Sequence, residues 1–220
     1  MQTPMDWKSI TAVFLDMDGT LLDLYFDNYF WHEHVPLRFS EKHTIDVHDA
    51  KQQLLKRYKN KAGTLDWYCV DFWENELGLD IAALKREVSK HIQIFPNVEK
   101  FLKKLKLHEK HVALVTNAHR KSIAVKMDHL ELEGYFDKII SSHDYGHAKE
   151  ELEFWRKFMQ AEPFDPATTL FIDDNLSVLA AAEAYGIQHL LSIKKPDSSK
   201  PLQDTLHYPA LADFDEIMPE

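Results

Sequence analysis

Short runs rich in branched and aromatic residues alternate with amphipathic stretches along most of the chain. Such runs are typical of strands that are buried on both faces of a sheet. We predict five of them, at Thr11–Leu15, Val112–Thr116, Lys138–Ser142, Thr168–Ile172 and Gln188–Ile193. Helical periodicity fills the stretches between the last four, at Ser122–Leu132, Glu150–Gln160 and Leu176–Tyr185, and Gly186 is placed to end the last helix. This alternation predicts an α/β fold with a parallel, Rossmann-like sheet.

The first two predicted strands are too far apart for a simple crossover. About ninety residues separate them, whereas a strand, one helix and the next strand need only about thirty. The intervening segment shows no strand pattern but several amphipathic helical stretches, among them Val47–Tyr58, Leu65–Leu77 and Ile81–Ile92. We therefore predict an α/β core formed by residues 1–23 and 95–220, with an all-helical cap domain, residues 24–94, inserted into it.

Two further features concern the return from the cap and the end of the chain. Pro96 suits the first turn of a helix predicted at Val98–Leu107 and makes a stiff return point. The tail, residues 194–220, contains four prolines and is predicted to be irregular before a short last helix.

Acidic residues follow two of the predicted strands. Asp16 and Asp18, in the sequence Asp-Met-Asp-Gly-Thr, come directly after the first strand, and Asp173 and Asp174 come directly after the strand at Thr168–Ile172. The carboxyl ends of parallel strands line the crevice where open α/β sheets bind ligands. Asp-Gly is also a common turn dipeptide, so the first pair alone could be structural.

If these two strands are neighbours, four carboxylates converge. Like charges about 4 Å apart repel by roughly 4 kcal/mol at an effective dielectric of 20, so the cluster needs a cation or strongly raised pKa values. A metal ion is the simpler solution, and hard oxygen ligands without cysteine or paired histidines favour Mg²⁺.

Polar residues also end the other strands. Thr116 and Asn117 follow the second strand, and Lys149 lies just before the helix that follows the third. A hydroxyl, backbone N–H groups and an ammonium can together bind the oxygens of a phosphoryl group. Taken singly, Thr116 and Asn117 could be a helix N-cap and Lys149 a solvated surface lysine.

The order of these motifs resembles the four motifs of the haloacid dehalogenase superfamily, and the inserted helices match its type-one cap. The resemblance implies that Asp16 is the nucleophile that becomes an aspartyl phosphate and that Asp18 is the general acid and base. It implies Mg²⁺ held by Asp16, the carbonyl of Asp18 and Asp174, with Asp173 as a further ligand or an orienting group. Dehalogenases of the superfamily lack the second carboxylate, so Asp18 favours phosphoryl chemistry.

The same resemblance gives the remaining motifs their roles. Thr116 and Asn117 would bind phosphoryl oxygens, and Lys149 would neutralise charge on the nucleophile and on the transferring group. Many relatives have Lys-Pro where this chain has Lys149-Glu150. That departure leaves the lysine in place and makes the local backbone less certain.

Aromatic residues concentrate in the predicted cap, in Leu21–Trp31 and Leu65–Tyr68. They could pack the cap's own core or form a platform on which a purine stacks. These stretches, with Thr116–His119 and Phe171–Asp174, resemble bacterial nucleotidases of the superfamily that dephosphorylate GMP and IMP. The resemblance implies a purine 5′-nucleotidase, for which Asp23, Asp27, Asn28 and His119 are candidate base contacts.

Other functions stay open at this point. The same scaffold could serve a phosphatase for phosphoglycolate or a sugar phosphate, or a phosphomutase that returns the phosphate to its substrate. A binding protein on an inactive scaffold should lack a catalytic motif, and none is missing here.

Composition narrows the possible partners. With 26 basic and 36 acidic residues the formal net charge is −10, which disfavours nucleic acid as a partner. No apolar run reaches the length of a membrane span, and no signal-peptide pattern precedes the first strand, so we expect a cytoplasmic monomer or small homo-oligomer acting on a small phosphorylated metabolite.

Cysteine and histidine carry no further prediction of chemistry. The single cysteine, Cys69, lies between Tyr68 and Val70 and is interpreted as a packing residue. The thirteen histidines include no His-Glu-x-x-His motif. His32 and His34 are two residues apart, so they would lie on different faces of a helix, and most histidines are interpreted as solvated or packing residues.

Overall fold

The computed structural model describes residues 5–220 and contains one six-stranded sheet in the order β3-β2-β1-β4-β5-β6. All the strand pairs are parallel. The strands are β1 Ala12–Leu15, β2 His111–Thr116, β3 Lys138–Ser141, β4 Thr169–Ile172, β5 His189–Ile193 and β6 Ala210–Leu211. The predicted α/β class and parallel Rossmann-like sheet are confirmed.

Strand β6 was not predicted. The tail was expected to be irregular, but Ala210 and Leu211 pair with Ser192 and Ile193 of β5. Both tail residues are buried, and a two-residue strand is too short to show the alternation that identifies strands in a sequence. A short 3-10 helix, η5 Phe214–Ile217, follows and matches the predicted last helix.

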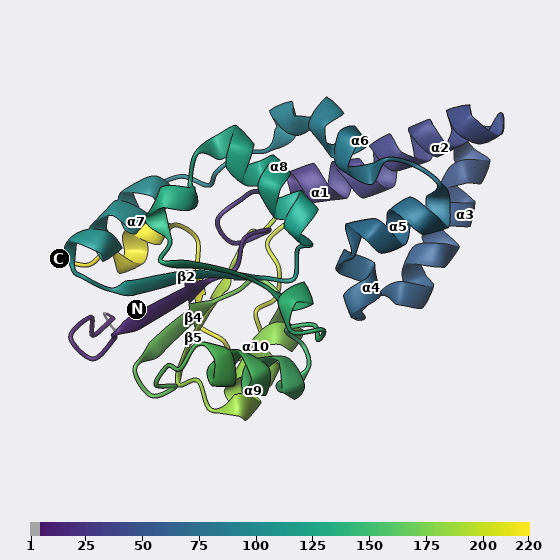
Figure 1. Ribbon diagram of the computed structural model, residues 1–220. Helices are drawn as coiled ribbons and strands as arrows, with labels where there is room; N and C mark the ends of the chain where they lie inside the picture. The colour runs from purple at the N-terminus through teal and green to yellow at the C-terminus, as the bar shows by residue number, and fades with distance from the viewer. Residues whose placement is uncertain (1–4) are drawn as a thin grey trace.

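Helices cover both faces of the sheet (Figure 1). α7 Val98–Leu107 and α8 Arg120–Leu130 lie on one face, and α9 Leu152–Ala161 and α10 Leu176–Tyr185 lie on the other. Because side chains alternate along a strand, Val13 and Leu15 of β1 pack with the first pair of helices, whereas Ala12 and Phe14 pack with the second. Gly186 ends α10 in the left-handed region, at φ 117°, as predicted.

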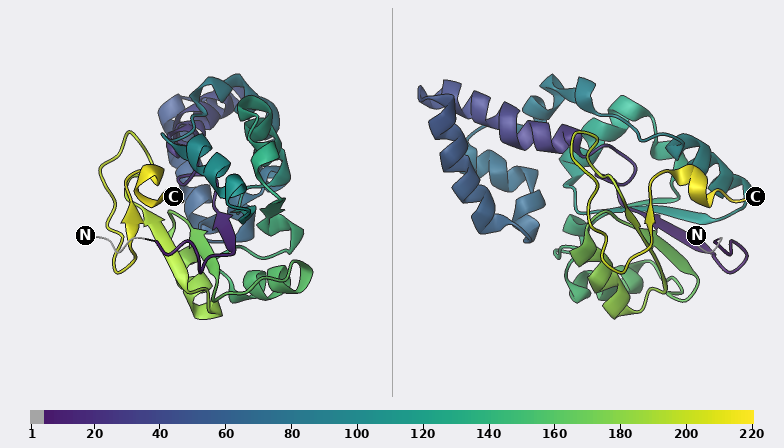
Figure 2. Two further views of the ribbon diagram at one scale, coloured as in Figure 1. Left: turned by 90° about the vertical axis from the view of Figure 1, so that its left-hand side faces the viewer. Right: turned by 180° about the vertical axis from the view of Figure 1, so that it is seen from behind.

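The segment of residues 25–91, which precedes α7, is helical throughout the part that forms regular structure. Its helices are α1 Tyr25–Tyr29, the π-helix η1 Phe30–His34, α2 Val35–His43, α3 Val47–Lys61, α4 Leu65–Tyr68, α5 Val70–Leu77, α6 Ile81–Glu87 and the 3-10 helix η2 Ser89–His91. We call this group of helices the cap. Figures 1 and 2 show it beside one end of the sheet, at the opposite side of the core from the two chain ends.

The two segments that lead into and out of the cap lie side by side. Leu22 forms an antiparallel bridge with Ile94, and the backbone N–H of Asp23 donates to the carbonyl of Gln93 at 2.9 Å. The domain boundaries at residues 23/24 and 94/95 stay a prediction. None of the helices in residues 5–220 is long and apolar enough to cross a bilayer.

Several predicted helices differ from the observed ones. The helix predicted at Leu65–Leu77 breaks at Cys69, whose backbone is extended (φ −82°, ψ 112°) and whose sulfur accepts a hydrogen bond from the N–H of Phe72 at 3.4 Å. The helix predicted at Ile81–Ile92 ends at Glu87 and continues only as a 3-10 turn. α8 begins before the predicted start at Ser122 because His119 caps it.

Pro96 does not occupy the first turn of α7, contrary to the prediction. It lies in a turn before that helix, and Asn97 at the N-cap adopts a left-handed conformation with φ 61°. Asparagine tolerates this conformation better than most residues, so Asn97 and Pro96 together make the return from the cap.

Candidate active site

The sheet order brings the two acidic motifs together. β1 and β4 are parallel neighbours with Leu15 opposite Ile172, so Asp16 and Asp173 emerge side by side at the carboxyl ends of these strands. The N–H of Asp16 donates to the carbonyl of Ile172 at 3.0 Å and extends the pairing by one residue. Carboxylate oxygens of Asp16, Asp173 and Asp174 all lie within 4.8 Å of one another.

Lys149 lies between two of these carboxylates and is almost completely buried. Its Nζ donates to Oδ1 of Asp16 at 2.5 Å, to Oδ2 of Asp173 at 2.7 Å and to the carbonyl of Val115 at 2.9 Å. All three N–H bonds of the ammonium therefore have acceptors. A solvated surface lysine, the alternative for this residue, is wrong.

One lysine does not balance the charge of the cluster. Burial raises the pKa of Asp16 to about 7; the Lys149 ammonium opposes this shift and Asp173 adds to it. Burial, together with the charges of Asp173 and Asp16, raises the pKa of Asp174 well above its usual range. Burial is the largest cause of these raised pKa values and Lys149 only partly opposes it, so the ionised cluster is incompletely stabilised by the groups around it. Three converging carboxylates with this deficit fit a divalent cation with a preference for oxygen ligands.

Gly19 allows the loop after β1 to pass close to Asp174. Its φ is +87°, and a Cβ built on it would lie 2.5 Å from Oδ2 of Asp174. A side chain at this position would both strain the backbone and displace a carboxylate of the cluster. This close approach explains the glycine in the Asp-Met-Asp-Gly-Thr sequence.

Asp18 belongs to a buried chain of charges that runs from the core into the cap. Nζ of Lys126, on α8, donates to Oδ1 of Asp18 at 2.5 Å and to Oδ2 of Asp27 at 2.6 Å. Oδ1 of Asp27 accepts from Nζ of Lys85, on α6, at 2.8 Å. Burial raises the pKa of Asp18 to about 6, which the Lys126 ammonium opposes. Burial also acts to raise the pKa of Asp27, but the two ammonium groups lower it below its usual range.

Lys126 and Lys85 were not predicted to be site residues. Each sits on the apolar face of its helix: Lys126 is three residues after Ile123 and four before Leu130, and Lys85 is four residues after Ile81. A lysine on such a face is costly to bury unless it is paired. Its presence there was the available signal that a carboxylate lies opposite.

Thr116 and Asn117 lie at the end of β2, beside Lys149. Oγ1 of Thr116 accepts from the N–H of Ala118 at 3.0 Å. Oδ1 of Asn117 accepts from the N–H of Lys149 at 2.8 Å, and its Nδ2 donates to Oε2 of Glu150 at 2.8 Å. His119, rather than either of these residues, is the N-cap of α8.

Glu150, the residue after Lys149, connects the core to the cap. Besides Asn117, its carboxylate accepts a hydrogen bond from the hydroxyl of Tyr68, on α4, at 2.7 Å. The departure noted in the sequence therefore supplies a contact between the two parts of the molecule.

A cavity of about 280 Å³ joins these groups to the cap. Its core side is formed by Asp16, Asp18, Thr116, Asn117, Lys149, Asp173 and Asp174. Its cap side includes Asp27, Asn28, Trp31, Trp67, Tyr68 and Lys85. The volume is near the lower end of the range for small-molecule pockets, about 300–1,000 Å³.

Two candidate substrate contacts lie elsewhere. Asp23 does not line this cavity; its Oδ1 accepts from the N–H groups of Tyr25 and Ser198, both at 3.0 Å, and so fixes the start of the cap. His119 also lies outside the lining. Asn28 does line the cavity, and its Nδ2 donates to Asp197 at 2.6 Å.

Known proteins resemble the whole chain or most of it. It is 36% identical over 219 residues to the GMP/IMP nucleotidase YrfG of Escherichia coli, covering 100% of this chain and 99% of that protein. A phosphorylated carbohydrates phosphatase of Thermotoga maritima is 24% identical over 185 residues, covering 83% of this chain and 84% of that protein.

The fold has solved counterparts as well. A HAD phosphatase from Thermococcus onnurineus superimposes with a TM-score of 0.77 at 21% identity, over 94% of this chain and 95% of the other. The model of the haloacid dehalogenase-like hydrolase family matches residues 10–186, which include every motif of the candidate site. The chain therefore belongs to the haloacid dehalogenase-like hydrolases and is an enzyme of phosphatase type.

Proposed function

We propose that the protein is a purine 5′-nucleotidase that hydrolyses a nucleoside monophosphate such as GMP or IMP to nucleoside and inorganic phosphate, with Mg²⁺ as cofactor. The observation that carries this proposal is the full-length similarity to a GMP/IMP nucleotidase at 36% identity. The arrangement of the cavity supports it, because a charged end in the core faces an aromatic end in the cap.

The aromatic end of the cavity suits a flat base. Trp31 and Trp67 are half-buried and line the cavity, with ring centroids 6.2 Å apart and planes inclined by 34°. Trp73, by contrast, is fully buried and packs against both rings. The aromatic residues of the cap therefore serve both uses considered for them, with Trp73 in the cap's core and Trp31 and Trp67 available for stacking.

Asp16 and Asp174 are the residues that would hold Mg²⁺, together with the backbone carbonyl of Asp18 and with Asp173 as a further ligand or an orienting group. Their donor atoms are all oxygen, and their raised pKa values indicate an incompletely stabilised ionised cluster that a divalent ion would stabilise. The bound ion would supply charge neutralisation for the phosphoryl group and for the carboxylates around it.

The residues of the chain divide the reaction into two displacements. A carboxylate oxygen of Asp16 attacks phosphorus while the bond to the ester oxygen breaks, and the carboxyl proton of Asp18 passes to that oxygen. A water molecule then attacks phosphorus, gives its proton to Asp18, and releases phosphate from Asp16. Thr116, Asn117 and Lys149 bind the phosphoryl oxygens during both steps.

The pKa of Asp18 suits this double use. A group that must first donate and then accept a proton works best when its pKa lies near the working pH. Burial raises the pKa of Asp18 to about 6, and Lys126 keeps it from rising further. Lys126 also holds the carboxylate through a 2.5 Å hydrogen bond.

A panel of phosphate esters tests the proposal directly. GMP, IMP, AMP, a pyrimidine nucleotide, phosphoglycolate and a hexose phosphate would each be assayed for phosphate release with Mg²⁺ and with EDTA. We expect the highest kcat/KM for GMP or IMP and a loss of at least about a hundredfold in EDTA.

Several outcomes of the panel would contradict the proposal. A preference for the hexose phosphate would support the alternative favoured by the carbohydrate phosphatase relative from Thermotoga maritima. Full activity in EDTA would remove Mg²⁺ from the reaction. Isomerised ester in place of free phosphate would indicate a phosphomutase.

Lys126→Met should lower kcat and shift the pH profile. Loss of the ammonium raises the pKa of Asp18, since Lys126 opposes the effect of burial. Asp18 then keeps the proton that it must donate up to a higher pH, so the alkaline limb of the kcat/KM profile should shift to higher pH. The value of kcat should fall about ten- to a hundredfold, because Asp18 loses the contact that positions it. Lys138→Met, which removes a lysine paired with Glu162 on the surface, is the matched control. An unchanged alkaline limb in Lys126→Met would contradict this role.

A further inference from the structure

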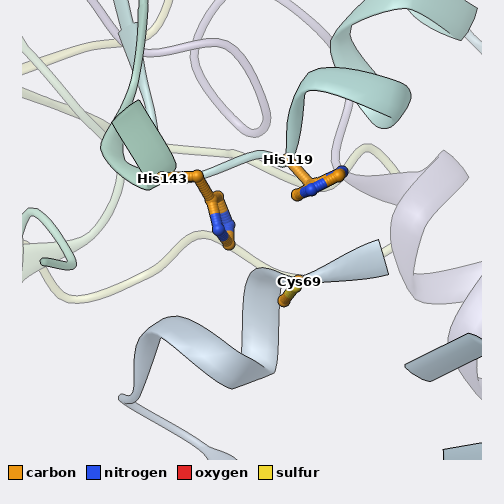
Figure 3. A group of neighbouring side chains, drawn as sticks. All are labelled: Cys69, His119 and His143. Atoms are coloured by element: carbon orange, nitrogen blue, oxygen red, sulfur yellow. The ribbon is translucent and has the colours of Figure 1, made fainter. Parts of the chain in front are cut away.

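The geometry points to a second metal site, formed by Cys69, His119 and His143, that takes a zinc-class cation and joins the cap to the core. The three residues come from separate parts of the chain. Cys69 lies between α4 and α5 of the cap, His119 caps α8, and His143 lies in the 3-10 helix η4 Ser142–Asp144 that follows β3 (Figure 3). One ligand atom from each lies within 4.8 Å of the other two.

The two imidazoles are in the state that metal ions bind. Burial and the proximity of His119 lower the pKa of His143 to about 4, and burial lowers the pKa of His119. A lowered pKa favours the neutral imidazole, which has one unprotonated nitrogen that can bind a metal. In His119, Nδ1 accepts from the N–H of Lys121 at 3.3 Å, so metal binding by this ring would replace that capping hydrogen bond. The centroids of the two rings are 4.9 Å apart with planes at 82°.

His143 also has an unused ring nitrogen. Its Nε2 is buried and has no hydrogen-bond partner within the described residues 5–220. A buried polar atom without a partner is destabilising by about 1–3 kcal/mol, so such atoms usually have a ligand, an ion or a water. A cation bound at Nε2 would give this atom a partner.

Cys69 faces the rings from the N-terminus of a helix. Its sulfur already accepts a hydrogen bond from the N–H of Phe72 in the first turn of α5, at 3.4 Å. Metal ions bind cysteine as the thiolate, and binding releases the thiol proton. Asp71 lies beside the site, 3.7 Å from Nε2 of His119, and is itself paired with Nζ of Lys121 at 2.7 Å.

The donor set selects the class of ion. One sulfur and two imidazole nitrogens suit Zn²⁺ and Co²⁺ and exclude Mg²⁺, which prefers oxygen. Tetrahedral zinc with its usual bond lengths holds ligand atoms about 3.5 Å apart, so atoms within 4.8 Å need to approach by only about 1 Å. Thiolate and imidazole ligands thus distinguish this site from the all-carboxylate cluster around Asp16.

A cation bound to Cys69, His119 and His143 would hold the cap in place over the cavity. Cys69 follows Tyr68, whose hydroxyl donates to Glu150 of the core at 2.7 Å, and His119 is close in sequence to Asn117, which lines the cavity. The cation would therefore reinforce an existing contact between the cap and the core beside the proposed substrate site. The binding of the metal itself does not depend on the proposed nucleotidase activity.

Cobalt spectroscopy of the full-length, tag-free protein tests this inference. Metal-free protein would be titrated with Co²⁺ in the presence of excess Mg²⁺, which occupies oxygen sites. We expect one equivalent of Co²⁺ to produce a near-ultraviolet thiolate-to-cobalt charge-transfer band, and Zn²⁺ to abolish it. Because the chain has a single cysteine, such a band reports Cys69 alone.

Conservative variants show which residues hold the ion. Cys69→Ser keeps a helix-capping oxygen, and His143→Gln keeps a polar side chain, so both should fold; each should lose the band or weaken binding at least about a hundredfold. His48→Gln, on the exposed face of α3, should keep it. Circular dichroism of each variant checks the fold. No band in folded wild-type protein, or an unchanged band in His143→Gln, would overturn the inference.

A stability measurement separates binding at this site from binding at the aspartates. Zn²⁺ at a hundredfold excess over its Kd should raise the Tm of the wild type by roughly 5–10 °C. The increase should disappear in Cys69→Ser. An equal increase in both proteins would assign the zinc to the carboxylates and contradict the site.

Discussion

Asp16→Asn is expected to abolish phosphate release and to leave the fold intact. An amide oxygen is a far weaker nucleophile than a carboxylate, so the first displacement fails, and kcat should fall by ~10⁴-fold or more. The substitution keeps the size of the side chain, and Lys149 keeps its contact with Asp173 at 2.7 Å. Removal of a carboxylate whose pKa burial raises to about 7 also lowers the repulsion within the cluster. Initial rates at saturating ester would measure the effect.

The control for this variant is Asp128→Asn, on the exposed face of α8, which should retain full activity. Mass spectrometry after the assay must show that the amide introduced by Asp16→Asn has not deamidated, since deamidation would restore the nucleophile. Turnover within tenfold of the wild type, by protein with the expected mass, would remove Asp16 from the mechanism.

The position of the carboxylate cluster could be predicted because it depends on local patterns. Asp16 and Asp173 each follow an apolar run, and in a parallel sheet such residues share one edge. The only further requirement was that β1 and β4 be neighbours, as they are. Asp174 is predicted to lie near Asp16 because it follows Asp173 directly. The absence of a side chain at Gly19 leaves room for its carboxylate.

The contacts between the cap and the core could not be predicted in this way. Lys126 and Lys85 meet at Asp27, although the two lysines come from α8 and α6. The local sequence does not determine how the cap is oriented on the sheet. A lysine on an apolar helix face can be recognised from the sequence, but the carboxylate that pairs with it cannot. The same holds for Tyr68 and Glu150.

Cys69 illustrates the limit most clearly. Its neighbours Tyr68 and Val70 are apolar or aromatic, and this context led to the interpretation that the thiol only packs. The groups that face it, His119 and His143, are far away in the sequence and show no spacing typical of metal ligands. Only the position of the cap on the core brings the three together.

Lys149→Met should have the second-largest effect, on stability as well as activity. The variant leaves Asp16 and Asp173 buried without the ammonium that contacts both. Breaking a buried ion pair by removing one partner typically destabilises by ~3–5 kcal/mol, a large part of a domain's total stability. Loss of a cation at the phosphoryl group should lower kcat by ~10²–10³-fold. Lys100→Met, which breaks an exposed pair with Asp215, is the control and should change neither quantity measurably.

The difference in unfolding free energy between the wild type and Lys149→Met should increase with pH, because the Asp16 carboxyl becomes ionised. In the metal-free wild type this group has a folded-state pKa of about 7, raised by burial above its usual 3.8, so stability falls as pH rises between these values. Without Lys149, which opposes that shift, the pKa rises further and the fall continues above pH 7. Urea unfolding in EDTA should therefore show a small difference at pH 5, where Asp16 is protonated in both proteins, and a larger one at pH 8. A difference that shrinks from pH 5 to pH 8 would mean that Lys149 does not stabilise the ionised cluster.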